Sequence, residues 1–410
     1  MALLKTMRRQ IALFFAVLGP GFITAMVDND AGGIFTYSEA GARWGYTPLW
    51  TLIPITLALI VAQEMCSRMG AVTGKGLSDL IREEFGFRMT FIVMVVLFLV
   101  NLANVAANFA GIAGSLELFS VSRYISVPIG AALVWLLVVK GTYDSVEKVF
   151  LVASSFYFAY IVSALMVQPD WGKAMEATVT PVLINHPGYI AVLVGLVGTS
   201  VAPWMQFYLQ AAVVEKGIDE KQYRDSRIEV VVGCIVMSMI AFFIIVSSAG
   251  AIWEQGPREI QDASEAALAL KPLGDYAYLL FSAGLLFASL FAASILPLST
   301  AYTVCEGLGF ESGVNQRFDE APAFYWLYTG LIVVGAGMVL IPGFPLVRMI
   351  LWSQVLNGVL LPVILIFTLM LINRSDLMGE WTNSKFFNLV AYLTVGAMIV
   401  LSLALAWMSL

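Results

Sequence analysis

Long apolar segments, separated by short polar ones, recur along the whole chain. Segments long enough to cross a bilayer lie at residues 11–41, 47–69, 89–118, 125–140, 146–167, 188–214, 228–253, 274–303, 323–342, 346–372 and 386–409. This pattern predicts an all-α polytopic membrane protein with eleven transmembrane helices. Because no soluble domain fits between the segments, we expect residues 1–410 to form a single transmembrane domain.

Polar residues interrupt the first of these segments. The run Asp28-Asn29-Asp30-Ala31-Gly32-Gly33 lies within apolar sequence that begins at Ile11 and resumes at Ile34. A carboxylate at bilayer depth is costly and is by default a functional-site hypothesis. Glycines favour local unwinding, and unwound backbone is tolerated in a membrane only where it lines a cavity or is buried in protein. The interruption therefore predicts half of a cation site.

The sixth segment has a similar interruption, between Gly195 and Trp204. Pro203 removes a backbone donor and frees carbonyls in the middle of the segment, so a simple proline kink is one interpretation. Breaks in segments one and six, with five segments to each repeat, instead indicate an inverted-repeat transporter with a midplane site. The repeats would span about 11–167 and 188–372, followed by an extra helix at 386–409.

Composition and charge support a membrane protein and set its orientation. The chain is 60% hydrophobic and 12% charged, with a mean hydropathy of +0.86. Of its 22 Lys and Arg residues, 16 lie on the side of the N-terminus and 6 on the other. This asymmetry predicts a multi-pass protein of the cell (inner) membrane with a cytoplasmic N-terminus and an extracytoplasmic C-terminus. No basic patch indicates a nucleic-acid partner.

Few residues carry catalytic chemistry. The chain has one histidine, His186, and three cysteines, Cys66, Cys234 and Cys305, without zinc or disulfide spacing. We therefore expect no enzyme and no cofactor, and we expect the cysteines to be buried. Asn101, Asn104 and Asn108 recur at helical spacing, which fits either interhelical hydrogen bonds or a hydrophilic pathway.

Several short motifs make the chain similar to a known family. They are Gly19-Pro20, Asp30-Ala31-Gly32-Gly33, Ala40-Gly41-Ala42, residues 70–77, Glu306-Gly307 and Ser353-Gln354-Val355. In order and spacing they resemble the Nramp family of divalent-metal transporters. The resemblance implies a LeuT-like fold of two inverted five-helix repeats plus an eleventh helix, with helices one and six broken. It also implies a divalent metal ion and the lipid bilayer as partners, and we expect a monomer.

The departures from the family pattern concern the metal ligands. In Nramps an Asp and an Asn of helix one and a Met of a helix-six Met-Pro-His motif hold the metal. Here Asp30 keeps the Asp, Gly33 replaces the Asn, and Ala202-Pro203-Trp204 replaces Met-Pro-His. Thioether sulfur selects softer metals, whereas Mg²⁺ is held through one or two carboxylates and keeps several waters. Small residues at 33 and 202 would enlarge the cavity for such an ion. The pattern thus resembles the Nramp-related magnesium transporters, with Mn²⁺ also accepted.

The predicted site combines one anionic ligand, two backbone carbonyls, two small residues and an amide that contacts a largely hydrated ion. These are Asp30, the carbonyls near Val27 and Thr199, Gly33 and Ala202, and Gln354. Asp28 is a second candidate carboxylate on the access path, and Asn108 and Trp204 belong to the same predicted pathway.

The family's proton route is also altered. Trp204 replaces the helix-six His, Asn108 and Gly111 stand where two acids are expected, and residues 323–330 lack the paired arginines. We therefore predict uptake that is not coupled to protons. The membrane potential would draw the ion inward, because it contributes about 2.3 kcal/mol per charge per 100 mV. The main alternative is a proton-coupled Mn²⁺/Fe²⁺ transporter. An amino-acid transporter of the same fold, a channel and a membrane-embedded enzyme are further alternatives, although Asp30 would repel a substrate carboxylate.

Overall fold

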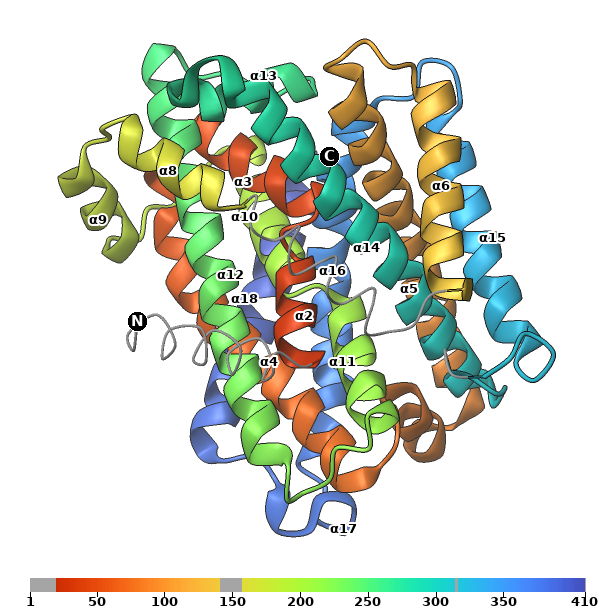
Figure 1. The fold of residues 1–410 in the computed structure, drawn as a ribbon. Coiled ribbons are helices and arrows are strands. Elements are labelled where there is room, and N and C mark those ends of the chain that lie inside the picture. Colours follow the sequence, from red (N-terminus) through yellow and green to blue (C-terminus); the bar gives the residue numbers. More distant parts are fainter. Residues whose placement is uncertain (1–19, 141–156, 314–315, 410) are drawn as a thin grey trace, which may run out of the picture.

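The computed structural model describes residues 20–140, 157–313 and 316–409, and it is built from helices joined by short loops (Figure 1). The first half contains α2 (Pro20–Val27), α3 (Ala31–Trp44), η1 (Thr47–Thr51), α4 (Leu52–Thr73), α5 (Leu77–Glu117), α6 (Arg123–Lys140), α8 (Phe158–Met166) and α9 (Trp171–Val179). The second half contains α10 (Pro187–Ser200), α11 (Pro203–Glu215), α12 (Tyr223–Ala251), η3 (Trp253–Gln255), α13 (Ala263–Ala267), η4 (Leu268–Tyr276), α14 (Ala277–Leu308), α15 (Pro322–Val339), α16 (Leu346–Ile372), α17 (Ser375–Met378), η5 (Gly379–Trp381) and α18 (Lys385–Ser409).

Many of the helices are long and apolar enough to cross a bilayer. The described residues contain eight such spans, and the apolar part of α6, Arg123–Val139, is somewhat shorter. The first and fifth predicted segments overlap residues 1–19 and 141–156, which lie outside the described residues. The molecule is thus a multi-pass all-helical protein, and the count of eleven helices stays a prediction.

Local capping explains where the helices of the first and sixth segments begin and end. Asp30 is the N-cap of α3, because its Oδ1 accepts a 2.9 Å hydrogen bond from the backbone N–H of Gly33. Pro203 opens α11, a position where a missing N–H leaves no helical bond unmade. In Figure 1, α3 and α10 occupy the upper half of the molecule, and α2 and α11 lie in the lower half.

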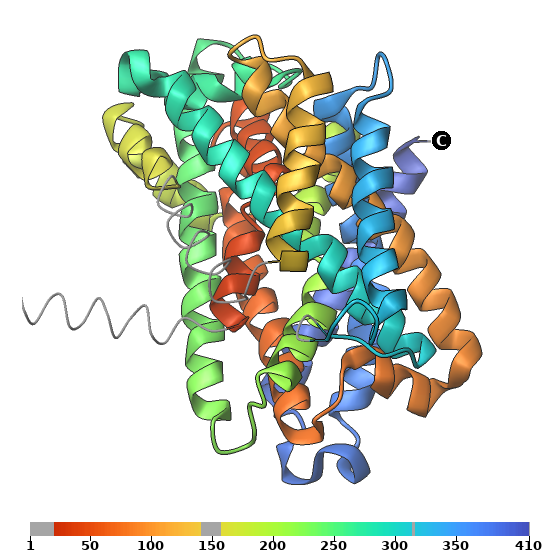
Figure 2. The same cartoon turned by 45° about the vertical axis from the view of Figure 1, so that its right-hand side comes forward.

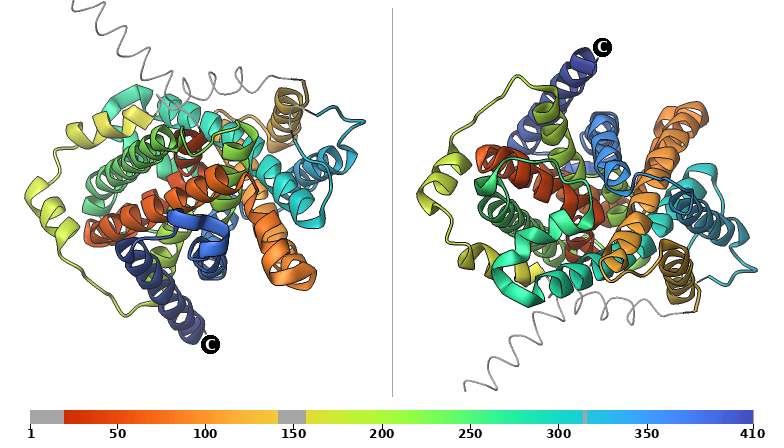
Figure 3. Two further views of the ribbon diagram at one scale, coloured as in Figure 1. Left: turned by 90° about the horizontal axis from the view of Figure 1, so that it is seen from below. Right: turned by 90° about the horizontal axis from the view of Figure 1, so that it is seen from above.

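The two longest helices, α5 and α14, pack against each other along one side of the group formed by α2, α3, α10 and α11. α6 and α15 lie next to them, at the right-hand edge in Figure 1, and α6 faces the viewer in Figure 2. The end-on views of Figure 3 show α18 at a different edge, where it packs against α16, α10 and α4. Cys66, Cys234 and Cys305 are buried, as expected from the sequence.

Glycines allow one pair of helices to touch through their backbones. A Cβ added to Gly198 of α10 would collide with the carbonyl oxygen of Gln354 and the nitrogen of Gly358, both on α16. A Cβ added to Gly358 would likewise collide with the carbonyl oxygen of Val194 on α10. Such close approach of helices through small residues is typical of membrane interiors.

Candidate metal site

The Asp30 carboxylate lies in the turn between α2 and α3 and is 7% exposed. Besides the bond from Gly33, its Oδ2 accepts a hydrogen bond of 2.8 Å from Nδ2 of Asn108 on α5. The Asn108 Oδ1 accepts a longer bond of 3.4 Å from the backbone N–H of Ala31. A carboxylate has about four acceptor sites, so two bonded N–H groups hold it in place and leave lone pairs for a ligand.

An amide from α16 lies directly against this turn. A Cβ added to Gly32 would collide with the Gln354 side-chain amide and would lie 2.9 Å from the Asp30 Oδ1. The backbone carbonyl of Gln354 also lies against Gly198 of α10. Gln354 therefore bridges the helix α3 that follows the first break and the helix α10 that precedes the second.

The Gln354 amide belongs to a buried network between α5 and α16. Its Nε2 donates to Oδ1 of Asn104 at 3.2 Å and to Oγ of Ser353 at 3.0 Å. Asn357 donates to Oε1 of Gln354 at 3.0 Å and to Oδ1 of Asn104 at 3.1 Å, and it accepts from Nδ2 of Asn104 at 2.8 Å. A network in which each amide is bonded fixes the orientation of its members, so Gln354 is held over Gly32.

The end of α10 lies close to α3. The Tyr37 hydroxyl of α3 lies 2.9 Å from Oγ of Ser200, the last residue of α10. Carbonyls of the last turn of a helix have no intrahelical partner, and Thr199 belongs to that turn. The Val27 carbonyl accepts a 3.0 Å bond from the N–H of Asp30 but retains a second lone pair.

The glycine at position 33 does not leave open space at its Cβ position. The carbonyl oxygen of Asp28 occupies the room that a Cβ would need, and the Tyr37 ring lies 3.3 Å from the same point. Gly33 instead allows two backbone segments to approach each other, so our expectation of a larger cavity at this residue was wrong. Ala202, the N-cap position of α11, is buried and adds no polar side chain.

The three asparagines of α5, at positions 101, 104 and 108, each bond a different partner. Asn108 bonds Asp30, Asn104 bonds Asn357, and Asn101 donates to Oγ1 of Thr300 on α14 at 2.9 Å. All three make interhelical hydrogen bonds, and two of them contact predicted site residues, since Asn108 bonds Asp30 and Asn104 accepts from Gln354. The hydrophilic pathway stays a prediction. Sequence reasoning missed Asn357, although its spacing of three from Gln354 places both on one helix face.

Trp204, in α11, packs against residues outside this amide network. It is buried in the first turn, where its ring packs at 6.2 Å from that of Tyr208 and its carbonyl accepts from Oγ of Ser299. Gly111 marks another close contact, since an added Cβ would collide with the Ser289 hydroxyl and lie 2.6 Å from the Ala31 Cβ. An acid at position 111 could not fit without displacing both neighbours.

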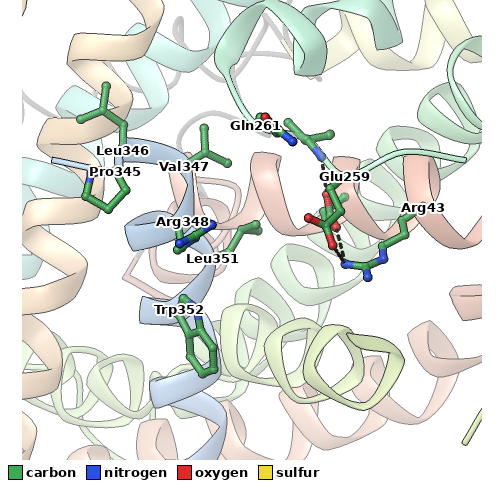
Figure 4. A pocket seen from close by; sticks show the side chains of 11 residues that line it. Arg43, Glu259, Gln261, Pro345, Leu346, Val347, Arg348, Leu351 and Trp352 are labelled. Atoms are coloured by element: carbon green, nitrogen blue, oxygen red, sulfur yellow. Dashed lines mark hydrogen bonds and ion pairs between the residues drawn. The ribbon is translucent and has the colours of Figure 1, made fainter. Parts of the chain in front are cut away.

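A cavity of about 450 Å³ opens between the upper ends of α3 and α16, and Figure 4 shows the side chains that line it. Arg43 and Glu259 form a 2.5 Å ion pair on one wall, and Arg348 and Trp352 of α16 lie on the opposite wall. A second cavity of about 270 Å³ shares Arg43, Glu259 and Trp352 and extends down to Thr36 and Val355.

The described residues contain no cluster of three or more His, Cys, Asp or Glu side chains able to hold a metal ion. The carboxylate of Asp30 and the helix-end carbonyls are oxygen ligands, the type that suits hard divalent cations. Gln354 faces Gly32 with its Nε2, and its Oε1 accepts from Asn357. With so few side-chain ligands, an ion bound here would keep part of its hydration shell.

Comparisons with known proteins show what the chain as a whole is similar to. The Nramp family profile, described as natural resistance-associated macrophage protein-like, matches residues 21–408. The chain is 24% identical over 389 residues to the divalent metal cation transporter MntH of Yersinia pestis, covering 93% of this chain and 92% of the relative. It is 25% identical over 411 residues to MntH of Deinococcus radiodurans, covering 97% and 91%. The manganese transporter of Eremococcus coleocola, solved with an aromatic bis-isothiourea compound, superposes with a TM-score of 0.75 at 20% identity, over 95% of this chain and 85% of that one. The fold is therefore that of these transporters, an all-helical LeuT-like fold.

Proposed function

Because the chain belongs to the Nramp family, we propose that it takes up divalent metal ions across the cell membrane, with Mg²⁺ as the main substrate and Mn²⁺ also accepted. The chain is not an enzyme, since the proteins that it is similar to are transporters. The metal ion is cargo, and no cofactor is implied.

The observation that carries this proposal is the position of Gln354 against both Gly32 and Gly198, next to the Asp30 carboxylate. In inverted-repeat transporters, ions bind near the bilayer midplane between two discontinuous helices. We assign the pairs α2/α3 and α10/α11 to those helices and the repeats to residues 11–167 and 188–372. The N-terminus then lies in the cytoplasm, and the cavity beside Arg43 faces the outside.

Within this site Asp30 supplies the anionic ligand, and the carbonyls of Val27 and Thr199 supply neutral oxygens. The Nε2 of Gln354 faces Gly32, so Gln354 would contact the ion through a water of its hydration shell. Ala202 adds no thioether where the relatives carry Met, which favours a harder ion over softer transition metals. The scarcity of side-chain ligands supports an ion that stays largely hydrated, as Mg²⁺ does because it loses water reluctantly.

Uncoupled transport is part of the proposal. Asn108 is neutral and is bonded to Asp30, and the Ser289 and Ala31 side chains leave no room for an acid at Gly111. Trp204 offers no titratable group in place of the relatives' histidine. A membrane potential alone then draws a divalent ion inward, at about 2.3 kcal/mol per charge per 100 mV.

Reconstituted liposomes test both parts. Vesicles that carry the protein and an internal Mg²⁺ indicator should take up Mg²⁺ when a negative internal potential is imposed, and those with Asp30→Ala should not. An internal pH indicator should stay constant during uptake. Acidification that requires both the metal and the protein would favour the alternative, a proton-coupled Mn²⁺/Fe²⁺ transporter. A wild-type protein that moves neither Mg²⁺ nor Mn²⁺ would contradict the proposal as a whole.

A further inference from the structure

A second buried carboxylate lies two residues before Asp30. Asp28 directly follows α2 and is 3% exposed, and none of the described residues donates a hydrogen bond to either of its oxygens. The adjacent Asn29 is fully buried, and its side-chain oxygen and nitrogen have no partner within the described part of the chain either. Buried polar groups are nearly always hydrogen-bonded, so two consecutive exceptions in one turn require an explanation.

Asp28 and Asp30 differ in the hydrogen bonds that their carboxylates accept from the protein. Asp30 receives N–H groups from Gly33 and Asn108, which stabilise a carboxylate. Asp28 receives none from the described chain. Asp28 also directly follows the C-terminal end of α2, whose dipole places partial negative charge there. The surroundings of Asp28 thus raise the free energy of its ionised carboxylate, and they would favour the binding of a cation beside it.

The described side chains that interact electrostatically with Asp28 carry no positive charge. Tyr37 of α3 and Cys234 of α12 interact with it electrostatically. The Tyr37 hydroxyl is already engaged with Ser200 at 2.9 Å and with the Met237 sulfur at 4.0 Å. Over the described ranges, no Lys or Arg forms an ion pair with Asp28.

We propose that Asp28, with the amide oxygen of Asn29, is a second contact for the transported divalent cation, so that the ion passes between the Asp28 and Asp30 carboxylates. Two carboxylates offered in turn match the charge of a divalent ion, and a hard cation takes carboxylate and amide oxygens together with water. This inference rests on the proposed function and deepens it.

Metal titrations of the purified full-length protein test the inference. Mn²⁺ is the probe, and binding is followed by calorimetry and by the rise in melting temperature that a ligand of the native state produces. Asp28→Asn keeps the shape of the side chain and removes its charge, and it should weaken Mn²⁺ binding by about tenfold or more, a loss of the size that one contact provides. Asp28→Glu keeps the charge and should retain more affinity than Asp28→Asn.

Glu64→Gln is the matched control, because Glu64 is an equally buried carboxylate but is paired with Arg68 at 3.2 Å. It should bind Mn²⁺ like the wild type. Equal affinities for Asp28→Asn and Glu64→Gln would overturn the inference, and so would a stronger loss in Asp28→Glu than in Asp28→Asn. If Asp30→Asn abolishes wild-type uptake while Asp28→Asn leaves it unchanged, the transport function stands and only the role of Asp28 fails. If the wild type neither binds nor moves Mn²⁺ or Mg²⁺, the proposed function itself is wrong.

Discussion

Nδ2 of Asn108 donates a hydrogen bond of 2.8 Å to Oδ2 of Asp30, which ties the middle of α5 to the first turn of α3. The bond fixes one oxygen of the carboxylate. Without this bond the carboxylate would reorient. Part of the binding free energy of the ion would then be used to fix the orientation of the carboxylate.

We therefore expect Asn108→Ala to raise the apparent KM for Mg²⁺ uptake by roughly tenfold, the equivalent of about 1.4 kcal/mol for one charge-assisted hydrogen bond. Uptake into liposomes measures this value. Asn101→Ala is the matched control, since Asn101 lies on the same helix but bonds Thr300. A KM that changes equally in both variants would contradict a specific role for Asn108.

Gly33 should tolerate no side chain, even the smallest. Because the Asp28 carbonyl occupies the position of a Cβ, Gly33→Ala forces two backbone segments apart, an overpacking cost of about 1–3 kcal/mol. We expect a lower melting temperature in metal-free buffer. Gly330→Ala in α15 meets nothing within 4 Å and should be neutral or slightly stabilising, since Ala favours a helix over Gly by about 1 kcal/mol. A Gly33→Ala protein as stable as Gly330→Ala would refute the close approach.

The two carboxylates of the first break should affect stability in opposite directions. Asp30→Ala removes the N-cap of α3 and should cost about 1 kcal/mol. Asp28→Asn removes a buried charge that no described residue bonds, so it should raise the melting temperature of the metal-free protein. Thermal unfolding in the presence of a chelator compares the two variants with the wild type. A destabilised Asp28→Asn would indicate that Asp28 has a structural partner.

The Arg43–Glu259 ion pair links the upper end of α3 to the segment between η3 and α13 (Figure 4). Glu39 strengthens this link, since its Oε2 accepts a 2.7 Å bond from the N–H of Ile260. Exchanging the partners, Arg43→Glu with Glu259→Arg, should restore uptake relative to either single variant. The coupling should be small, about 0.2–1 kcal/mol, because Glu259 is largely exposed. A double variant no better than the worse single variant would exclude a direct interaction.

The sequence predicts individual residues of the candidate site better than the contacts between them. Asp30 and Gln354 stand out in the sequence because charged and amide side chains are rare in apolar segments. The packing of Gln354 on Gly32 and the amide network with Asn104 and Asn357 depend on which helices become neighbours, and a hydropathy pattern does not contain that information.

Residue size was the less reliable guide. A glycine at position 33 suggests vacant space when only the sequence is known, but in the fold the Asp28 carbonyl fills that position. The same limitation hid the contrast between Asp28 and Asp30, which look alike in the sequence. Only the structure reveals that Asp30 is hydrogen-bonded, whereas no described residue donates to Asp28.

The contact of Gly198 with Gly358 has a mechanical consequence. Two helices whose backbones interlock without intervening side chains resist sliding, so α10 and the adjoining part of α16 should move as one rod. Gln354 belongs to that rod, and its amide would be carried with it whenever the upper half of the molecule tilts. If α10 tilts relative to α11, the change in backbone direction falls at Val201 and Ala202, where α10 ends and α11 begins.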